Sequence, residues 1–369
     1  MQPKPFKLER YFARYEFNTR YVLSASDPEA VSIKELLALE PGAAGAFHDV
    51  SLGYTQTEGD PELRHAVASL YDGVGPDGVR LYNGGEEAIF IFLNAALSAG
   101  DHVIVQFPAY QSHYSVAESA GIEVSRWHSD LSAGGAPDPD DLEPLIKPST
   151  RAILITTPNN PTGYVFDQAR LDCLVEIARR RGLWIFADEM YRGSERGPRD
   201  RQPAICDLYE RGVSLSGTSK TYGLPGLRIA WLATRDPDLF KQIAGLKDYL
   251  TICNSAPSEF LATLALRHSE ELLERVRRIL THNLGLLDAF FARHADTWEW
   301  HRPRGGTTGF PRFLPGDTDA LCAQLIQQAG VMLVPSSAFD AGTDRVRIGY
   351  GRQNLPAALV AFEAWMARH

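Results

Sequence analysis

The chain of 369 residues is long enough for about two domains, and its 44% hydrophobic and 22% charged residues are typical of a soluble globular protein. Its formal net charge of −9 at pH 7 disfavours a nucleic-acid partner, because phosphate backbones are bound by basic surfaces. No apolar run approaches the roughly 18 residues of a membrane span, so we expect no membrane partner. The four cysteines are Cys173, Cys206, Cys253 and Cys322, and their spacing fits neither a metal site nor a disulfide framework. They predict reduced thiols in a cytoplasmic protein without a metal site.

Helix-start signals mark the first elements of the chain, after residues that look like an arm. Ser32 and Glu35 form a capping box ahead of a short apolar helix. Asp60 and Pro61 open another helix, since aspartate is a good N-cap and proline suits the first helical position.

The middle of the chain alternates between strands and helices. Three apolar, β-rich segments predict buried strands at 103–105, 152–156 and 183–187. A helix with one apolar face is predicted at 168–181, between the last two strands. This rhythm predicts a parallel sheet covered by helices on both faces.

Beyond about residue 256 the pattern changes to long helices and short strands. We expect helices at 258–294, 318–329 and 355–368, and strands at 331–334 and 345–348. The prediction is therefore an α/β fold with two domains. The large domain spans 47–255, and a smaller α+β domain combines an N-terminal arm at 1–46 with 256–369.

Residues 216–228 carry the most informative motif. Lys220 lies among small and hydroxyl residues, and Arg228 follows beyond a turn rich in glycine and proline. Small neighbours admit a planar cofactor, hydroxyls and a guanidinium suit a phosphate, and the amine could form a Schiff base. Taken alone, the segment fits a surface lysine in a loop equally well, so the rest of the chain must decide.

Four other motifs have the chemistry of one cofactor site. Gly84 and Gly85 precede an apolar helical segment at 89–97, where free backbone N–H groups can bind an anion. The others follow predicted strands, at the end of the sheet where α/β proteins bind ligands. They are Tyr110, Asn160 in Pro158-Asn-Asn-Pro-Thr-Gly163, and Asp188 with Tyr191. A carboxylate leaving so apolar a strand calls for a cationic partner, whereas a plain turn or a core tyrosine would explain some of the others singly.

Together and in this order, the motifs resemble those of the class I and II aminotransferases, in the pyridoxal phosphate fold type I superfamily. The resemblance extends from about residue 47 to the end of the chain. It implies pyridoxal 5′-phosphate as cofactor and a large domain with a mostly parallel seven-stranded sheet flanked by helices. It also implies an enzyme that transfers the α-amino group of an L-amino acid to a 2-oxo acid.

The resemblance assigns roles to individual residues. Lys220 would carry the Schiff base and move the proton, Asp188 would pair with the ring nitrogen, and Tyr110 would stack on the ring. Asn160 and Tyr191 would bind the ring oxygen. The phosphate would be held by Gly84, Gly85, Glu86, Arg228 and a hydroxyl near Lys220.

Three assignments differ from the usual family pattern or leave a choice. The family has a serine where Gly217 stands, so the phosphate hydroxyl must come from Ser216, Thr218 or Ser219, of which we favour Thr218. Arg347 matches the arginine that binds the substrate carboxylate, with Asn160 beside it, but Arg345 is close by on the same predicted strand. Tyr54 matches a tyrosine that reaches the phosphate of the neighbouring subunit, which would make the protein a homodimer with shared active sites.

The fold leaves the reaction open, because the cofactor supplies the chemistry. Transamination is the favoured reaction, and a lyase, cyclase or oxidase acting on an amino acid such as arginine is the alternative. The layout is also similar to that of capreomycidine-synthase-like members of the superfamily. Asp27, Glu58 and Glu86 could give the pocket an acidic character, which would suit a basic substrate, although solvated loop charges explain them as well.

Overall fold

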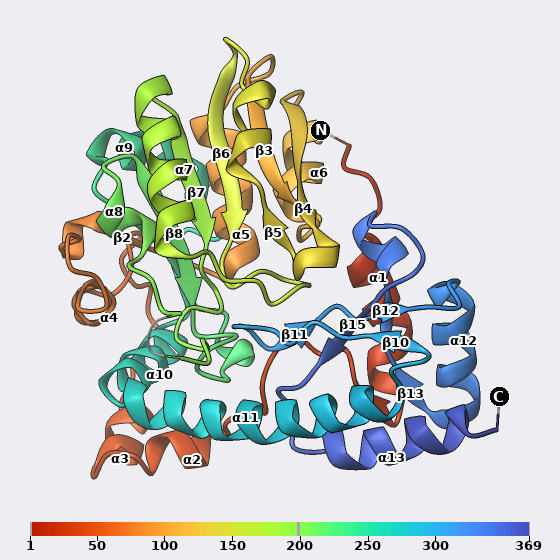
Figure 1. Cartoon of the computed structure of the whole chain (residues 1–369). Helices are drawn as coiled ribbons and strands as arrows, with labels where there is room; N and C mark the ends of the chain where they lie inside the picture. Colours follow the sequence, from red (N-terminus) through yellow and green to blue (C-terminus); the bar gives the residue numbers. More distant parts are fainter. Residues whose placement is uncertain (1, 198–199, 369) are drawn as a thin grey trace.

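A computed structural model describes residues 2–197 and 200–368, and its centre is one large twisted sheet (Figure 1). The strand order is β2-β9-β8-β7-β6-β3-β4-β5. In that order the strands span Val79–Tyr82, Ala230–Thr234, Gly212–Gly217, Trp184–Asp188, Thr150–Thr156, His102–Phe107, Glu123–Asp130 and Ala136–Pro137. The five strands from β8 to β4 pair in parallel, whereas β9 is antiparallel to both its neighbours. The sheet has one strand more than predicted, because the two-residue β5 pairs antiparallel with the end of β4.

Helices cover both faces of this sheet, as predicted from the apolar strands. Along β6, Ile153 and Ile155 pack in a core with Leu171 of α7, whereas Leu154 packs in a separate core with Phe92. Successive strand residues thus face opposite helical layers, which explains why the strands are apolar throughout. The helices of this part are α4 (Pro61–Ala68), α5 (Gly85–Ile91), α6 (Ser112–Ser119), α7 (Gln168–Arg181), α8 (Ile205–Leu208) and α9 (Pro237–Lys247). The helix predicted at 89–97 is the end of α5 and a π-helical turn at Phe92–Ala96.

A second set of short strands joins the two ends of the chain. β1 (Tyr21–Val22) pairs in parallel with β13 (Val331–Met332). The remaining strands are β10 (Trp298–Glu299), β11 (Thr308–Gly309), β12 (Arg312–Phe313), β14 (Val334–Pro335) and β15 (Val346–Gly349). The helices are α1 (Lys7–Tyr15), α2 (Ile33–Leu37), α3 (Ala43–His48), α10 (Ala256–Arg267), α11 (Ser269–Arg293), α12 (Thr318–Ala329) and α13 (Leu355–Met366). The β1–β13 pair agrees with a smaller domain built from both ends, while the exact domain boundaries stay a prediction.

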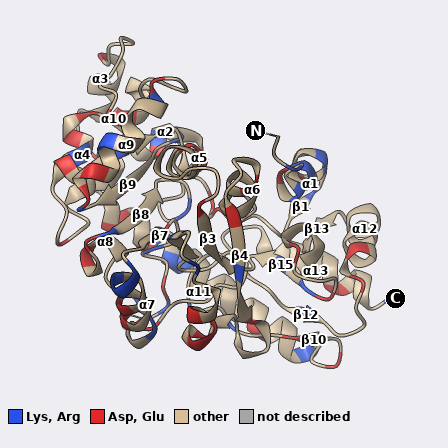
Figure 2. Ribbon diagram, turned by 90° about the horizontal axis from the view of Figure 1, so that it is seen from above, with Lys and Arg blue, Asp and Glu red and all other residues tan. Residues whose placement is uncertain are grey.

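The helix-start signals predicted from the sequence are confirmed, whereas two predicted elements are divided. The capping box of Ser32 and Glu35 is present, and Asp60 caps α4 through its carboxylate. The single helix predicted at 258–294 is wrong, because the backbone leaves the helical region at His268 and separates α10 from α11. The strand predicted at 331–334 is likewise divided into β13 and β14. Basic and acidic side chains share the same helices, such as α7 (Figure 2).

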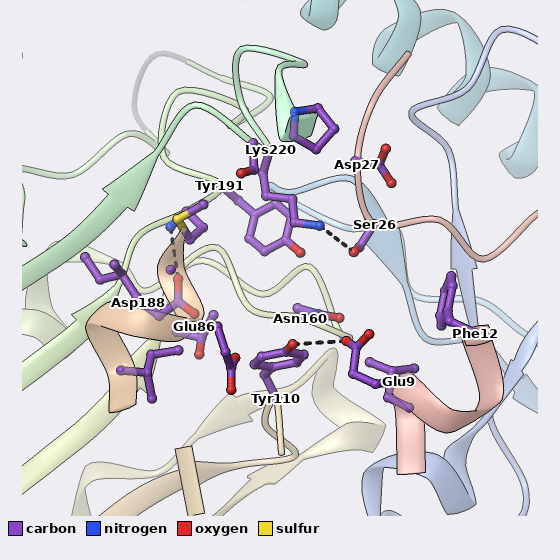
Figure 3. A pocket seen from close by; sticks show the side chains of 18 of the residues that line it. Glu9, Phe12, Ser26, Asp27, Glu86, Tyr110, Asn160, Asp188, Tyr191 and Lys220 are labelled. Carbon is purple, nitrogen blue, oxygen red and sulfur yellow. Dashed lines mark hydrogen bonds between the residues drawn. The ribbon is translucent and has the colours of Figure 1, made fainter. Parts of the chain in front are cut away.

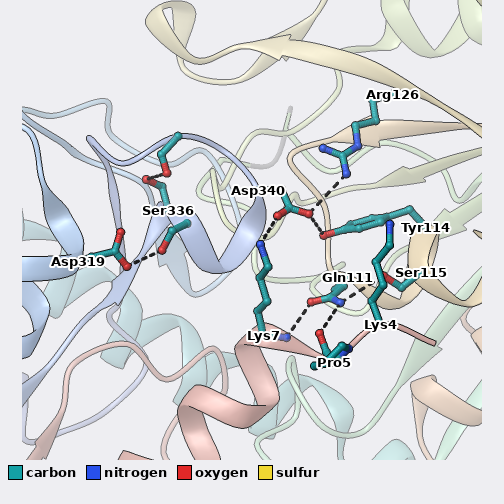
Figure 4. A network of polar contacts seen from close by, with 12 residues as sticks. Lys4, Pro5, Lys7, Gln111, Tyr114, Ser115, Arg126, Asp319, Ser336 and Asp340 are labelled. Carbon is teal, nitrogen blue, oxygen red and sulfur yellow. Dashed lines mark hydrogen bonds and ion pairs between the residues drawn. The ribbon is translucent and has the colours of Figure 1, made fainter. Parts of the chain in front are cut away.

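Asp340 fastens the N-terminal segment to both parts of the fold (Figure 4). Its carboxylate accepts hydrogen bonds from Lys7 on α1 and from the hydroxyl of Tyr114 on α6, the latter at 3.0 Å, and lies 3.4 Å from the guanidinium of Arg126 on β4. Partial burial raises the pKa of Asp340, but the hydrogen bonds from Lys7 and Tyr114 outweigh it and hold the pKa below its ordinary value. The carboxylate is therefore stabilised in the folded state.

We expect Asp340→Asn to lower the free energy of unfolding by about 1–3 kcal/mol at neutral pH, because hydrogen bonds to a charged group are lost. Because the folded pKa is depressed, this contribution is present above the unfolded pKa of Asp340 and disappears as the pH falls through the folded pKa. Urea unfolding at neutral and acidic pH measures both effects. Asp72→Asn, an exposed aspartate, is the matched control, and an equal loss at both pH values would contradict the prediction.

Candidate active site

A cavity of about 520 Å³ opens at the carboxyl ends of the parallel strands (Figure 3). Tyr110 follows β3, Asn160 follows β6, Asp188 is the last residue of β7, and Lys220 follows β8. Since parallel strands end at the same edge of a sheet, residues far apart in sequence meet here. The predicted site residues that line the cavity are Gly85, Glu86, Tyr110, Asn160, Asp188, Tyr191, Lys220, Arg228 and Arg347.

Lys220 places a primary amine inside this cavity. Its Nζ donates to the hydroxyl of Ser26 at 3.0 Å, and the Ser26 hydroxyl also contacts Tyr191. Burial lowers the pKa of Lys220, and Arg347 and Arg228 lower it further, whereas Asp27 and Glu9 oppose the shift. The neutral amine is the nucleophilic form of lysine, so these surroundings favour reactivity.

Asp188 is a buried carboxylate at the base of the cavity. Its Oδ1 accepts the backbone N–H of Met190 at 3.1 Å, and its Oδ2 lies 3.3 Å from Nε2 of His113. His113 is a site residue that our sequence reasoning missed. The available signal was its position three residues after Tyr110, at the start of α6. An aspartate at this depth requires a cation or several donors, and a protonated ring nitrogen in the cavity would supply the cation.

Gly84, Gly85 and Arg228 form a cradle for an anion. Gly84 has φ +92°, and a Cβ there would lie 2.1 Å from Nη2 of Arg228, so only glycine lets the guanidinium approach the start of α5. The backbone N–H groups of Gly85 and Glu86 begin that helix. The Glu86 side chain accepts a hydrogen bond from Ser112, and burial raises the pKa of Glu86. Backbone N–H groups and Arg228 suit a phosphate.

The prediction that Thr218 supplies the phosphate hydroxyl is not supported by the geometry. The Thr218 hydroxyl donates to backbone carbonyls of Leu224 and Ile229, at 3.4 and 3.2 Å, whereas Ser219 lines the cavity. The structure also explains Gly217, which pairs with Ala230 across β8 and β9. A Cβ on Gly217 would lie 2.8 Å from the Ile229 oxygen, so the serine usual at this position has no room.

Of the two late arginines, Arg347 enters the cavity. Its Nε donates to the Ser24 carbonyl and its Nη1 to Oδ1 of Asn160, both at 3.2 Å. The guanidinium carbon lies 5.4 Å from the ring centres of Phe12 and Phe339, which hold it in place. Arg345 donates instead to the carbonyls of Phe310 and Leu131 and does not line the cavity.

Two residues of the sequence analysis lie elsewhere. Tyr54 is 90% exposed and lies outside this cavity, beside a separate hollow formed with Leu52 and residues 253–257. Glu58 is exposed and does not line the cavity either, so only Asp27 and Glu86 of the three suggested acids do. Sequence reasoning also missed α1, which adds Glu9, Phe12 and neighbouring Glu16 to the lining.

In the two described ranges, no group of three or more His, Cys, Asp and Glu side chains is arranged to hold a metal ion. Among the same residues, no helix combines the length and the apolar character needed to cross a bilayer.

Comparison with known proteins agrees with this geometry. The model of the family described as aminotransferase class I and II matches residues 23–361. The chain is 30% identical to capreomycidine synthase of Streptomyces vinaceus, over 98% of this chain and 94% of that protein. It is 27% identical to an aspartate aminotransferase of Thermotoga maritima, over 85% and 83% of the two chains.

Two solved structures have closely similar folds. A PLP-dependent aminotransferase from Streptococcus suis gives a TM-score of 0.94 at 33% identity, covering 100% of this chain and 99% of that one. The PLP-dependent cyclase OrfR gives 0.91 at 27% identity, covering 100% and 98%. The cavity offers an amine for an aldehyde, a carboxylate for a ring nitrogen, donors for a ring oxygen and a cradle for a phosphate. The chain therefore belongs to the class I and II aminotransferase family, and its cofactor is pyridoxal 5′-phosphate.

Proposed function

We propose that this enzyme transfers the α-amino group of an L-amino acid to a 2-oxo acid by means of Lys220. The observation that carries the proposal is the shared cavity of Lys220, Asp188 and Arg347. The bound cofactor supplies an aldehyde for the amino group and an electron-withdrawing ring.

The residues around the cavity would hold this cofactor in a fixed orientation. Asp188 would pair with the ring nitrogen, and His113 lies beside its carboxylate. Arg228, the start of α5 and the Ser219 hydroxyl are placed for the phosphate. Tyr110 presents an aromatic face.

Donors for the ring oxygen come from Asn160 and Tyr191. The Asn160 amide oxygen already accepts from Arg347, which leaves its NH₂ group to donate. Burial raises the pKa of Tyr191 far above its usual range, so its hydroxyl keeps the proton it would donate.

Arg347 and Lys220 act on the substrate itself. Arg347 is placed to bind the α-carboxylate through a bidentate pair, which fixes the amino acid relative to the amine. With its lowered pKa, Lys220 can accept the proton from the substrate α-carbon at Nζ and release it again.

The reaction is tested by incubating the holoenzyme with single amino acids, with and without a 2-oxo acid, under air and under argon. Formation of a new amino acid that depends on the 2-oxo acid is expected. Release of ammonia without an acceptor, release of peroxide that needs air, or ring closure of the substrate would instead identify a lyase, an oxidase or a cyclase. The similarity to capreomycidine synthase and to OrfR makes ring closure the alternative to examine first.

We further propose that the enzyme acts in the cytoplasm as a homodimer with shared active sites. All four cysteines are free thiols, which suits a reducing compartment. Large apolar side chains are exposed around the hollow beside Tyr54 and on the segment after α9, as at an interface: Leu52, Tyr54, Tyr249, Leu250 and Ile252. Tyr54 would then reach the phosphate bound by the partner subunit.

Mixing Tyr54→Ala and Lys220→Ala subunits tests the shared site. Each variant alone is expected to be nearly inactive at low cofactor concentration. Subunit exchange creates heterodimers in which one site has both native residues, so about a quarter of the wild-type activity should return. Sedimentation analysis verifies the dimer, and a mixture no more active than its components would contradict shared sites.

A further inference from the structure

Helix α1 forms an acidic rim on one side of the active-site cavity. Glu9 lies on α1 and Glu16 directly follows this helix, seven residues or about two helical turns later, and both side chains line the cavity on the same face. Phe12 lies between them on that face, and Asp27 lies on the segment that passes Lys220 (Figure 3). Three carboxylates thus surround the entrance.

The partners of these carboxylates differ. Asp27 is paired with Arg352 at 2.6 Å. Glu9 accepts the hydroxyl of Tyr110 at 3.0 Å. Within the described residues, neither Glu9 nor Glu16 has a Lys or Arg side chain at ion-pair distance. Burial raises the pKa of Glu16, and Asp27 and Glu9 raise it further, as expected for a carboxylate among like charges, although Arg352 and Lys220 oppose the shift.

Arg347 adds a buried cation to the lining of the same cavity, with its guanidinium carbon 5.4 Å from the ring centre of Phe12 on α1. Arg347 is only 1% exposed and makes its hydrogen bonds to a carbonyl and an amide, with no carboxylate at ion-pair distance among the residues described. A buried guanidinium without a counter-ion, aimed into a cavity, calls for an anionic ligand group. The cavity lining therefore combines a buried cation with two carboxylates, those of Glu9 and Glu16, that have no Lys or Arg side chain at ion-pair distance among the residues described.

We propose that the substrate is an α-amino acid with a cationic side chain, a guanidinium or an ammonium, and that Glu9 and Glu16 select it. This inference rests on the proposed function, in which Arg347 holds the α-carboxylate. The side chain of an amino acid oriented in that way can extend toward α1. A second carboxylate, as in aspartate or glutamate, would meet like charge there and be rejected.

Binding can be measured without turnover. Borohydride reduction fixes the cofactor on Lys220, and calorimetry with this protein gives dissociation constants for L-arginine, L-lysine, L-citrulline and L-glutamate. Citrulline has nearly the shape of arginine but no charge. We expect arginine or lysine to bind at least about tenfold more tightly than citrulline, and glutamate to bind most weakly. The difference between arginine and lysine distinguishes a guanidinium site from an ammonium site.

Single substitutions test whether Glu9 and Glu16 cause the preference for a cationic side chain. Glu9→Gln and Glu16→Gln retain an acceptor oxygen and lose only the charge, so each should reduce the arginine-to-citrulline ratio several-fold and leave citrulline binding unchanged. Glu271→Gln, at an exposed position outside the cavity lining, is the control with the same charge change. Equal binding of arginine, lysine and citrulline, no binding of either cation, or an unchanged ratio in both variants would overturn the proposal.

These results are separable from the proposed reaction. Amino transfer from a neutral or acidic amino acid, without binding of either cationic one, would refute the substrate class and leave transamination standing. Tight binding of arginine or lysine without amino transfer would refute the reaction and leave the cationic subsite standing. Failure of borohydride to fix the cofactor would refute the role of Lys220.

Discussion

Replacing Lys220 with alanine should reduce amino transfer by at least about 1000-fold, because both the cofactor-binding amine and the proton acceptor are lost. The cavity retains Asp188 and Arg228 in this variant, so the cofactor should still bind, but without a covalent bond. Borohydride treatment followed by mass measurement distinguishes the two states, since only the wild-type chain should retain the added mass. Single-turnover kinetics with a saturating amino acid measure the loss.

A small soluble amine provides the control for this experiment. It can enter the space left by the lysine side chain and accept the α-proton, so part of the lost rate should return with increasing amine concentration. Covalently fixed cofactor in Lys220→Ala, or a rate within tenfold of wild type, would show that another residue serves as the amine.

Asp188→Asn should lower kcat/KM between about 100- and 1000-fold, as expected when one partner of a buried ion pair is removed. Asparagine has the same size and can still accept the Met190 N–H, so the fold should be unchanged. The specific loss would be the charge that we propose keeps the ring nitrogen protonated, and this loss should also shift the absorbance of the bound cofactor. Steady-state kinetics and spectra across pH measure both effects.

His113→Gln tests how much His113 contributes to kcat/KM through its contact with Asp188. His113 contacts the Asp188 carboxylate and does not line the cavity, so we expect a smaller loss than in Asp188→Asn, of about 10- to 100-fold. A larger loss in His113→Gln than in Asp188→Asn would contradict the assignment of Asp188 as the partner of the ring nitrogen.

Four residues singled out by sequence patterns meet in one cavity, for a physical reason. Tyr110, Asn160, Asp188 and Lys220 each follow an apolar strand, and parallel topology alone brings such positions to one edge. Locating them required only the strands and their direction. The strands do not determine which way a side chain points within the turn that follows them.

Thr218 and Ser219 are adjacent in one turn, and only the packing of residues 224 and 229 against that turn determines which hydroxyl faces the cavity. Similarly, Gly217 looked like a missing phosphate ligand, but contact with β9 requires glycine there.

The acidic rim was beyond the reach of local patterns. Glu9 lies on α1 and Glu16 directly follows it. The position of this helix depends on contacts of Lys7 with Gln111 and Asp340, each more than one hundred residues away in sequence. Glu58 looked equally suitable as a pocket acid, yet it faces solvent. The charge of a loop residue does not indicate whether its side chain faces the cavity or the bulk solvent, because water can hydrate the charge in either position.

The cavity lining includes Phe6 and Arg347, so it draws on residues synthesised before the central sheet and on residues synthesised after it. A growing chain can form β3 and β6 early, but Arg347 cannot enter the cavity until β15 has left the ribosome. Until then α1 also lacks Asp340, to which Lys7 is fastened. Binding of the cofactor in a cavity that also selects the substrate should therefore occur late in the biosynthesis of this protein. A chain stalled before residue 340 would leave the carboxyl ends of its central strands exposed.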